Sequence, residues 1–241
     1  MHIDMQSSPS ERFREFFQAY QDENGRHIYV EQVQKMSLEG LLSLFVNYDD
    51  LLRFDPVSAK TLREKPEDTF KAADDALVEV LTIEDPIYAS SDETAGLFHV
   101  RFSNLPDLVD LRRLRSVHLG KLLSVEGIII RQSIVKPLLI QGIFQCTRKG
   151  CEEIHFVPQE GGYYTEPSKC NNPQCTNTSS FKLLTKDENT IYTDFQSVTV
   201  QEKPESLPPG QIPRSVPARL IGDLVDTVRA GDRAIVSGIL R

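Results

Sequence analysis

Apolar side chains recur with the period of an α-helix along the first two fifths of the chain. Three stripes have the three- and four-residue spacing that places side chains on one helix face. They comprise Phe13, Phe16, Phe17 and Tyr20, then Leu38, Leu41, Leu42, Phe45 and Tyr48, and then Phe70, Ala73, Leu77 and Leu81. Residues Ser8 to Glu11 match a capping box with proline at the first helical position. The pattern predicts an N-terminal bundle of three or four amphipathic helices.

After residue 96 the hydrophobic pattern changes to the two-residue period of β-strands. Helix-breaking residues between Glu84 and Gly96 mark the boundary. The pattern predicts strands at His99–Phe102, Leu122–Ile130, Leu138–Phe144, Ile191–Gln201, Ser215–Ile221 and Arg233–Leu240, and a short helix at Pro106–Arg115. Gly127, inside the strongest strand, is typical of a bulge or a tight bend at a barrel corner. This set of strands fits an OB-type barrel, although periodicity alone does not separate it from another small barrel.

Residues 202–214 contain four of the fourteen prolines. Because proline lacks an N–H donor and fixes φ, this stretch cannot be strand or helix throughout. We expect a long, stiff loop, and ordered loops of this length commonly have a function.

The net charge of −8 argues at first against nucleic-acid binding, which usually requires a basic surface. The charge is unevenly distributed, however. Residues 1–96 contain 9 Lys or Arg against 20 Asp or Glu, whereas residues 97–241 contain 18 against 15. Residues 97–151 alone contain 9 basic against 3 acidic residues. This local surplus of positive charge could face a polyanion.

The four cysteines form two C-x4-C pairs separated by eighteen residues. Cys146 and Cys151, with Cys170 and Cys175, can close a tetrahedron around Zn²⁺, with a hairpin through Gly161 and Gly162 between the pairs. The alternatives are two disulfides or four free thiols. His155 could replace one cysteine as a ligand, but four cysteine ligands leave no coordination position for it. A closed four-cysteine site has no position for water, so the expected zinc is structural.

The chain contains no Walker, dinucleotide-binding, nucleophile-elbow or HExxH motif, so catalysis by this chain alone is not expected. It also contains no apolar run long enough to span a membrane and no signal peptide. The sequence therefore predicts an intracellular protein without a membrane partner.

Several cations and aromatic residues are candidates for nucleic-acid contacts. Arg131 and Lys136 flank the end of the strongest predicted strand, where they are either binding residues or solvated charges. Three arginines, at positions 112, 113 and 115, would spread around a helix, which favours a solvated helix or a subunit contact. Three aromatic residues near these positions could stack on bases: Phe144, Tyr192 and Phe195. Aromatic residues on strands more often belong to the hydrophobic core.

Four stretches together resemble the N-terminal region of an archaeal minichromosome maintenance (MCM) replicative DNA helicase. They are LVDLRRLRSVHLGKLLSVEGIIIRQSIVKP (108–137), the paired cysteines with YYTEPSKC, DFQSVTVQEKPESLPPGQIPRSV (194–216) and DLVDTVRAGDRAIVSGIL (223–240). The resemblance implies a multidomain α + β protein that combines a helical bundle with an OB-fold β-barrel and an inserted four-cysteine zinc ribbon. The implied boundaries are 1–96 for the bundle, 97–145 and 187–241 for the two parts of the OB-fold, and 146–186 for the ribbon.

The resemblance also implies roles for individual residues. Arg131, Lys136 and Lys203 match DNA-binding positions of the family. The loop at 201–214 resembles the one that couples this tier to the motor, with its expected coupling residues at Gln201, Glu202, Pro209, Gly210 and Arg214. The x4 spacing of both cysteine pairs departs from the x2 spacing that is common in the family.

Two functions follow from the resemblance. The first is the DNA-binding, ring-assembling N-terminal tier of a hexameric ATP-dependent helicase for replication initiation and unwinding. The second is a zinc-stabilised module that assembles subunits and has negligible DNA affinity of its own. Under the first function the chain is a non-enzymatic fragment, and ATP and Mg²⁺ act only in a C-terminal ATPase domain beyond Arg241. The implied partners are single- and double-stranded DNA, that ATPase domain, and further copies in a hexamer or double hexamer, in the cytoplasm at the nucleoid.

Overall fold

The computed structural model describes residues 8–90, 97–106, 108–159, 164–207 and 210–241. The chain forms two compact units. The first unit comprises Met1–Ile128, Val200–Val216 and Arg233–Arg241, and the second comprises Ile129–Thr199 and Pro217–Asp232. Among the described helices, none combines the length and apolarity needed to cross a lipid bilayer.

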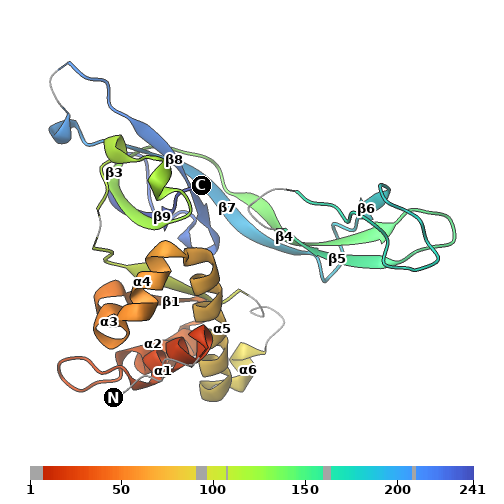
Figure 1. Cartoon of the computed structure of the whole chain (residues 1–241), viewed down its shortest axis with the longest axis horizontal. Coiled ribbons are helices and arrows are strands. Elements are labelled where there is room, and N and C mark those ends of the chain that lie inside the picture. The colour runs from red at the N-terminus through yellow and green to blue at the C-terminus, as the bar shows by residue number, and fades with distance from the viewer. Residues whose placement is uncertain (1–7, 91–96, 107, 160–163, 208–209) are drawn as a thin grey trace. The chain divides into compact units, whose positions relative to one another are not determined.

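Within its described residues, the first unit begins with six helices, which Figure 1 labels: α1 (Pro9–Ala19), α2 (Ile28–Glu39), α3 (Tyr48–Phe54), α4 (Pro56–Glu64), α5 (Pro66–Glu84) and α6 (Pro86–Ala89). The predicted capping box of α1 is confirmed, because the Ser8 hydroxyl accepts from the Glu11 N–H while the Glu11 carboxylate accepts from the Ser8 N–H. Proline starts α4, α5 and α6, where its missing N–H leaves no helical bond unmade.

The helix predicted from the stripe Leu38 to Tyr48 is wrong. Gly40, with φ of +68°, ends α2, and strand β1 (Ser43–Asn47) follows, paired in parallel with β2 (His99–Ser103). Leu44 and Val46 are buried while Phe45 between them is 55% exposed, which is the alternation of a strand. Over so short a stretch, the spacing of the apolar residues is compatible with both an α-helix and a β-strand. The left-handed Gly40 ends the helix, so the residues after it form a strand.

Aromatic side chains dominate the core of these helices. Phe16 is fully buried, with ring centroids 4.9 Å from Tyr29 and 5.4 Å from Phe54. The Tyr29 hydroxyl donates to Asp50 at 2.8 Å, so the buried ring keeps its polar end satisfied. The first and third predicted stripes therefore face this core, as their helical spacing indicated.

The β-region contains β3 (Leu122–Gln132), β4 (Lys136–Cys146), β5 (Ile154–Pro158), β6 (Phe181–Leu183), β7 (Ile191–Gln201), β8 (Ser215–Ile221) and β9 (Arg233–Ile239). The hydrogen-bonded order is β5-β4-β7-β3-β9, with β6 beside β4 and β8 beside β7. The predicted strands are all present, with bounds shifted by two residues or fewer. The predicted helix at Pro106–Arg115 is wrong, because the chain instead forms two single 3₁₀ turns, Leu111–Arg113 and Ser116–His118.

Between the cysteine pairs, β5 pairs with β4 from Gln145↔Ile154 to Gln141↔Pro158, and β6 also pairs with β4. The predicted turn and return strand, at Gly161, Gly162 and Tyr163, lie outside the described residues, and Tyr164 is not in a strand. Within the second unit, the cysteine segment is thus built on an extension of β4, as Figure 1 shows.

Gly127 is required by a close approach and not by a bulge. The β3–β9 register runs unbroken through Gly127↔Ala234. A Cβ atom at position 127 would lie 2.6 Å from the Val200 Cγ1 and still closer to the Gln201 carbonyl oxygen. Only glycine lets β3 pass this backbone without displacement.

We predict that Gly127→Ala lowers the free energy of unfolding by about 2 kcal/mol, because the added methyl overpacks a site bounded by backbone. Gly238→Ala in β9 is the matched control: nothing lies within 4 Å of its added methyl, and its stability should stay within about 0.5 kcal/mol of wild type. Urea unfolding followed by circular dichroism measures both. Equal stability of the two variants would contradict the close approach.

Candidate metal centre, cationic strand connection and loop

The four cysteine sulfurs converge in the second unit. All four Sγ atoms lie within 4.8 Å of one another, with 3.8 Å between Cys146 and Cys175 and 3.5 Å between Cys151 and Cys170. Four thiolates at a Zn–S distance of about 2.3 Å form a tetrahedron whose edges are about 3.8 Å. The same distances are far longer than an S–S bond, so the disulfide alternative is excluded in this structure. The arrangement fits a tetrahedral metal ion.

Two tight turns direct these side chains inward despite the x4 spacing. In the first, the Cys151 N–H donates to the Arg148 carbonyl at 3.0 Å, with Gly150 at φ of +81°. In the second, the Cys175 N–H donates to the Asn172 carbonyl at 2.9 Å. Cys151 and Cys175 end the two turns, whereas Cys146 ends β4 and Cys170 lies in the loop before the second turn. The x4 spacing is therefore compatible with a closed four-cysteine site.

Side-chain amides supply hydrogen bonds to the sulfurs. Asn177 Nδ2 lies 3.1 Å from the Cys146 Sγ, and Asn172 Nδ2 lies 3.6 Å from the Cys151 Sγ. Burial raises the pKa of the Cys146 thiol, but hydrogen bonds from the Arg148 backbone and Asn177 outweigh burial and lower its pKa to about 7. Burial and neighbouring thiols raise the pKa of Cys170 to about 12. A bound cation would favour the thiolate form at every position.

His155 is not part of the cluster. It lies in β5, where its side chain is 3% exposed and its ring meets Phe181 edge to face with centroids 5.2 Å apart. Among the described residues, the group placed to hold a metal consists of the four cysteines. The histidine therefore serves as packing beside the site.

Arg131 lies near the end of β3 and Lys136 begins β4, so the two residues flank the short connection 133–135, and both side chains are exposed. The two strands do not pair with each other, because β7 lies between them in the strand order. Within the described part of the chain, neither side chain forms an ion pair. An exposed, unpaired cation can contact a phosphate without first losing a carboxylate partner.

The connection 133–135 is held by Gln196 on β7, which is 1% exposed. Its Nε2 donates to the Ser133 carbonyl at 3.0 Å and to the Asp226 carboxylate at 2.9 Å, while its Oε1 accepts from the Asp226 N–H at 3.0 Å. Ser197 adds two bonds to Ser133, at 2.8 and 3.0 Å. Because every polar atom of this buried amide is satisfied, the backbone at Ser133 has one defined position.

The environment of Lys203 differs from that of Arg131 and Lys136. Its Nζ lies 2.6 Å from the Glu126 carboxylate in the first unit, and its side chain is 28% exposed. Contact between Lys203 and a phosphate would compete with this ion pair. The role of Lys203 in DNA binding stays a prediction.

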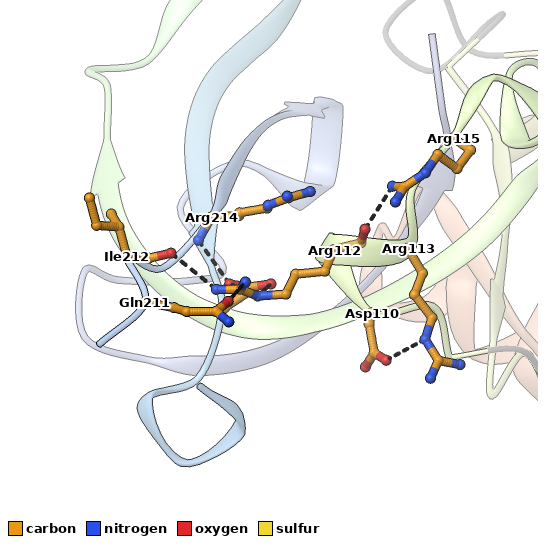
Figure 2. A network of polar contacts seen from close by, with 8 residues as sticks. Asp110, Arg112, Arg113, Arg115, Gln211, Ile212 and Arg214 are labelled. Carbon is orange, nitrogen blue, oxygen red and sulfur yellow. Dashed lines mark hydrogen bonds and ion pairs between the residues drawn. The ribbon is translucent and has the colours of Figure 1, made fainter. Parts of the chain in front are cut away.

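The proline-rich loop closes at a neck formed by Glu202 and Arg214. The Glu202 N–H donates to the Arg214 carbonyl, and the Arg214 N–H donates back to the Glu202 carboxylate, both at 2.9 Å. Arg112 completes the neck, because its Nε lies 2.9 Å from the Glu202 carboxylate. Its Nη2 donates to the Ile212 carbonyl at 3.1 Å, and its Nη1 donates to the Gln211 side-chain oxygen. Figure 2 shows Arg112 reaching into the loop, whereas Arg113 turns toward Asp110 and Arg115 turns back to the Arg112 carbonyl.

The expected coupling residues fall on different parts of this loop. Gln201 ends β7, Glu202 and Arg214 form the neck, and Gly210 has a φ of +78° that favours glycine. Pro209 lies outside the described residues. Glu205 adds a further ion pair, to Arg233 on β9.

The aromatic candidates for base stacking divide by burial. Phe144 is fully buried and belongs to the core, whereas Tyr192 is 39% exposed and Phe195 is half-buried on β7.

Sequence reasoning named Arg112 as part of a solvated helix or a subunit contact, whereas its side chain bonds Glu202, Gln211 and Ile212. It missed three residues that build these sites: Asn172, Asn177 and Gln196. No motif in the sequence distinguishes a buried amide from an exposed one.

Comparison with protein families matches two parts of the chain. Residues 110–241 match the MCM OB domain, and residues 10–104 match the MCM N-terminal domain. The first match alone covers more than half of the 241 residues. Periodicity alone did not separate an OB-type barrel from other small barrels, and this match favours the OB type.

Individual relatives match nearly the whole chain. The DNA replication licensing factor mcm2 of Xenopus tropicalis is 33% identical over 231 residues, which cover 94% of this chain and 25% of the relative. The protein of that name from Schizosaccharomyces pombe is 32% identical over 229 residues, covering 95% and 27%. The minichromosome maintenance protein MCM of Saccharolobus solfataricus is 29% identical over 231 residues, covering 95% and 33%. The chain thus spans about a quarter to a third of the length of these relatives, and because eukaryotic and archaeal proteins both match, an archaeal source stays a prediction.

We predict that Arg112→Ala lowers the free energy of unfolding by about 2 to 3 kcal/mol, because it leaves the Glu202 carboxylate, only 7% exposed, without its charged partner. The loop at 201–214 should also become more sensitive to limited proteolysis. Arg113→Ala is the matched control: its pair with Asp110 is exposed on both sides, so its stability should stay within about 0.5 kcal/mol of wild type. If both variants behave alike in urea unfolding, the neck does not depend on Arg112.

Proposed function

Because the chain belongs to the family of minichromosome maintenance proteins, we propose that it is the DNA-binding, ring-assembling N-terminal tier of a hexameric replicative helicase. The observation that carries the DNA-binding part is the connection between β3 and β4, where Arg131 and Lys136 are exposed and, among the described residues, form no ion pair, on either side of a backbone fixed by Gln196. Binding is electrostatic in the first place, since each cation displaces counterions condensed on the strand.

The four-cysteine cluster holds a structural zinc ion in this proposal. The donor set consists of four thiolates, which a borderline-soft ion such as Zn²⁺ accepts in tetrahedral geometry. The metal supplies folding free energy to a segment in which the apolar cluster of the described residues consists of the four cysteines and Phe181. Asn172 and Asn177 orient the sulfurs and offset part of their negative charge.

The proline-rich loop transmits conformational changes between this tier and a motor in the full-length protein. Its neck at Glu202, Arg214 and Arg112 gives it a defined shape on the first unit. ATP and Mg²⁺ act in the C-terminal ATPase domain of that longer protein, which is also a partner of the loop. The remaining proposed partners are single- and double-stranded DNA and further copies in a hexamer or double hexamer, wherever chromosomal DNA is replicated.

We predict that Arg131→Ala combined with Lys136→Ala weakens binding of single-stranded DNA at least about tenfold at low salt. The slope of log affinity against log salt should become shallower by about 1.4, since about 0.7 is lost for each phosphate contact on a single strand. Fluorescence anisotropy with a labelled oligonucleotide measures both quantities. The charge-matched control is Lys182→Ala combined with Lys186→Ala, which removes two exposed cations elsewhere in the second unit and should change neither.

If Arg131→Ala combined with Lys136→Ala leaves the affinity for single-stranded DNA unchanged, the two residues do not contact DNA. Sedimentation with and without DNA separates the two functions inferred from the sequence. Assembly of the chain without any DNA binding would favour the alternative, a zinc-stabilised module that only joins subunits.

We predict that protein purified without chelators contains about one zinc ion per chain, and that Cys175→Ser lowers both the zinc content and the thermal unfolding midpoint. Elemental analysis and calorimetry measure the two effects. Ser179→Ala changes an exposed residue near Cys175 and should leave both unchanged. Zinc-free native protein that is insensitive to chelation would exclude the metal.

A further inference from the structure

Asn177 contacts both cysteine pairs of the metal centre. Its side-chain Nδ2 lies 3.1 Å from the Sγ of Cys146, which belongs to the first pair. Its backbone carbonyl accepts from the N–H of Cys170, which belongs to the second pair, at 2.9 Å. A residue outside the two C-x4-C motifs thus joins the two segments that carry the sulfurs.

The other polar contacts of the Asn177 side chain hold its amide in one orientation. Its Oδ1 accepts from the Ser180 N–H at 3.2 Å, and its Nδ2 also donates to the Ser180 carbonyl at 2.6 Å. That carbonyl accepts in addition from the N–H and the hydroxyl of Thr147, the residue directly after Cys146, at 3.2 and 2.9 Å. Because the amide oxygen is occupied by an N–H donor, the nitrogen is the end of the amide that faces the sulfur.

An N–H donor at this position acts directly on a ligand atom. Four thiolates around a divalent cation keep an excess of negative charge on their sulfurs, and a hydrogen bond to a charged acceptor is stronger than one between neutral groups. Asn172 makes a comparable but longer contact, 3.6 Å, to the Cys151 Sγ. The Asn177 contact is therefore the stronger of the two side-chain amide bonds to the cluster.

We propose that Asn177 is a positioning residue of the metal centre, whose amide N–H directs the Cys146 thiolate toward the ion and sets how tightly the ion is held. This inference rests on the structural zinc of the proposed function and adds a residue that determines the affinity of that site. Groups that hydrogen-bond a metal ligand fix its orientation, and their loss typically lowers metal affinity about 10- to 100-fold.

The isosteric variant Asn177→Asp isolates this hydrogen bond. Aspartate keeps an oxygen that can accept from the Ser180 N–H, but it has no N–H for the Cys146 sulfur and places a negative charge beside it. In competition with a chromophoric chelator, the variant should bind Zn²⁺ about tenfold more weakly than wild type, or weaker still.

Asn171→Asp is the matched control. It makes the same chemical change at an exposed residue directly after Cys170, and within the described part of the chain the Asn171 side chain forms no hydrogen bond. A negative charge at an exposed position is well screened by water, so the affinity for Zn²⁺ should stay within about threefold of wild type.

NMR of the wild-type chain loaded with Cd²⁺ provides a readout that a merely structural asparagine would not give. Cd²⁺ is a softer ion that thiolate ligands also accept. The spin of its NMR-active isotopes couples to a proton through an N–H···S hydrogen bond to a bound sulfur. A correlation between the metal and a side-chain amide proton of Asn177 is therefore expected.

Equal Zn²⁺ affinities for Asn177→Asp and Asn171→Asp would overturn the proposal and leave the metal centre in place. Absence of the correlation in a Cd²⁺-loaded wild-type chain would do the same, and this measurement decides the question if Asn177→Asp does not fold. A wild-type chain that binds neither Zn²⁺ nor Cd²⁺ would overturn the metal centre itself, so the two failures are distinguishable.

Discussion

The ion pair between Arg112 and Glu202 joins the two ends of the proline-rich loop. Four prolines remove four N–H donors from this stretch, so fewer backbone hydrogen bonds are available to order it. The Glu202 carboxylate compensates by accepting from both the Arg112 guanidinium and the Arg214 N–H. A carboxylate that is 7% exposed is stable in the charged form only when such partners are present, so the neck and its arginine form together or not at all.

The same type of residue acts in two opposite electrostatic regimes in this chain. Arg112 is largely withdrawn from water and satisfied by its own chain, so its contribution is to local structure. Arg131 is exposed and unpaired among the described residues, so it adds little to stability and is available to a ligand. Counting basic residues in a segment cannot separate these regimes. The surplus of nine basic over three acidic residues in 97–151 therefore overstates the charge that is available to DNA.

Local sequence predicted those elements whose periodicity was long enough to be unambiguous. The capping box at Ser8, the stripe of α5 and the strands from Leu122 onward are all present because each has several residues in phase. The segment around Phe45 was assigned the wrong period, since five apolar residues over eleven positions fit a helix while the left-handed Gly40 and pairing with β2 produce a strand. The cysteine spacing predicted the convergence of the sulfurs, but not the asparagine amides that contact them, because Asn172 and Asn177 gain meaning only from the folded turns.

Two buried polar side chains, Gln196 and Glu202, connect these observations into one physical argument. Each is nearly inaccessible to water and hydrogen-bonds the backbone of a connecting segment. Gln196 bonds the Ser133 carbonyl and the Asp226 N–H, and the Glu202 carboxylate accepts from the Arg214 N–H, so each gives its connection a defined position. Fixing the connection in advance means that a ligand need not supply the ordering free energy when it binds. Beside these two anchors, Ile134 in the connection between β3 and β4 is 76% exposed, and Ile212 in the proline-rich loop is 85% exposed. Function in this chain therefore depends on polar residues of the interior as much as on the cations at its surface.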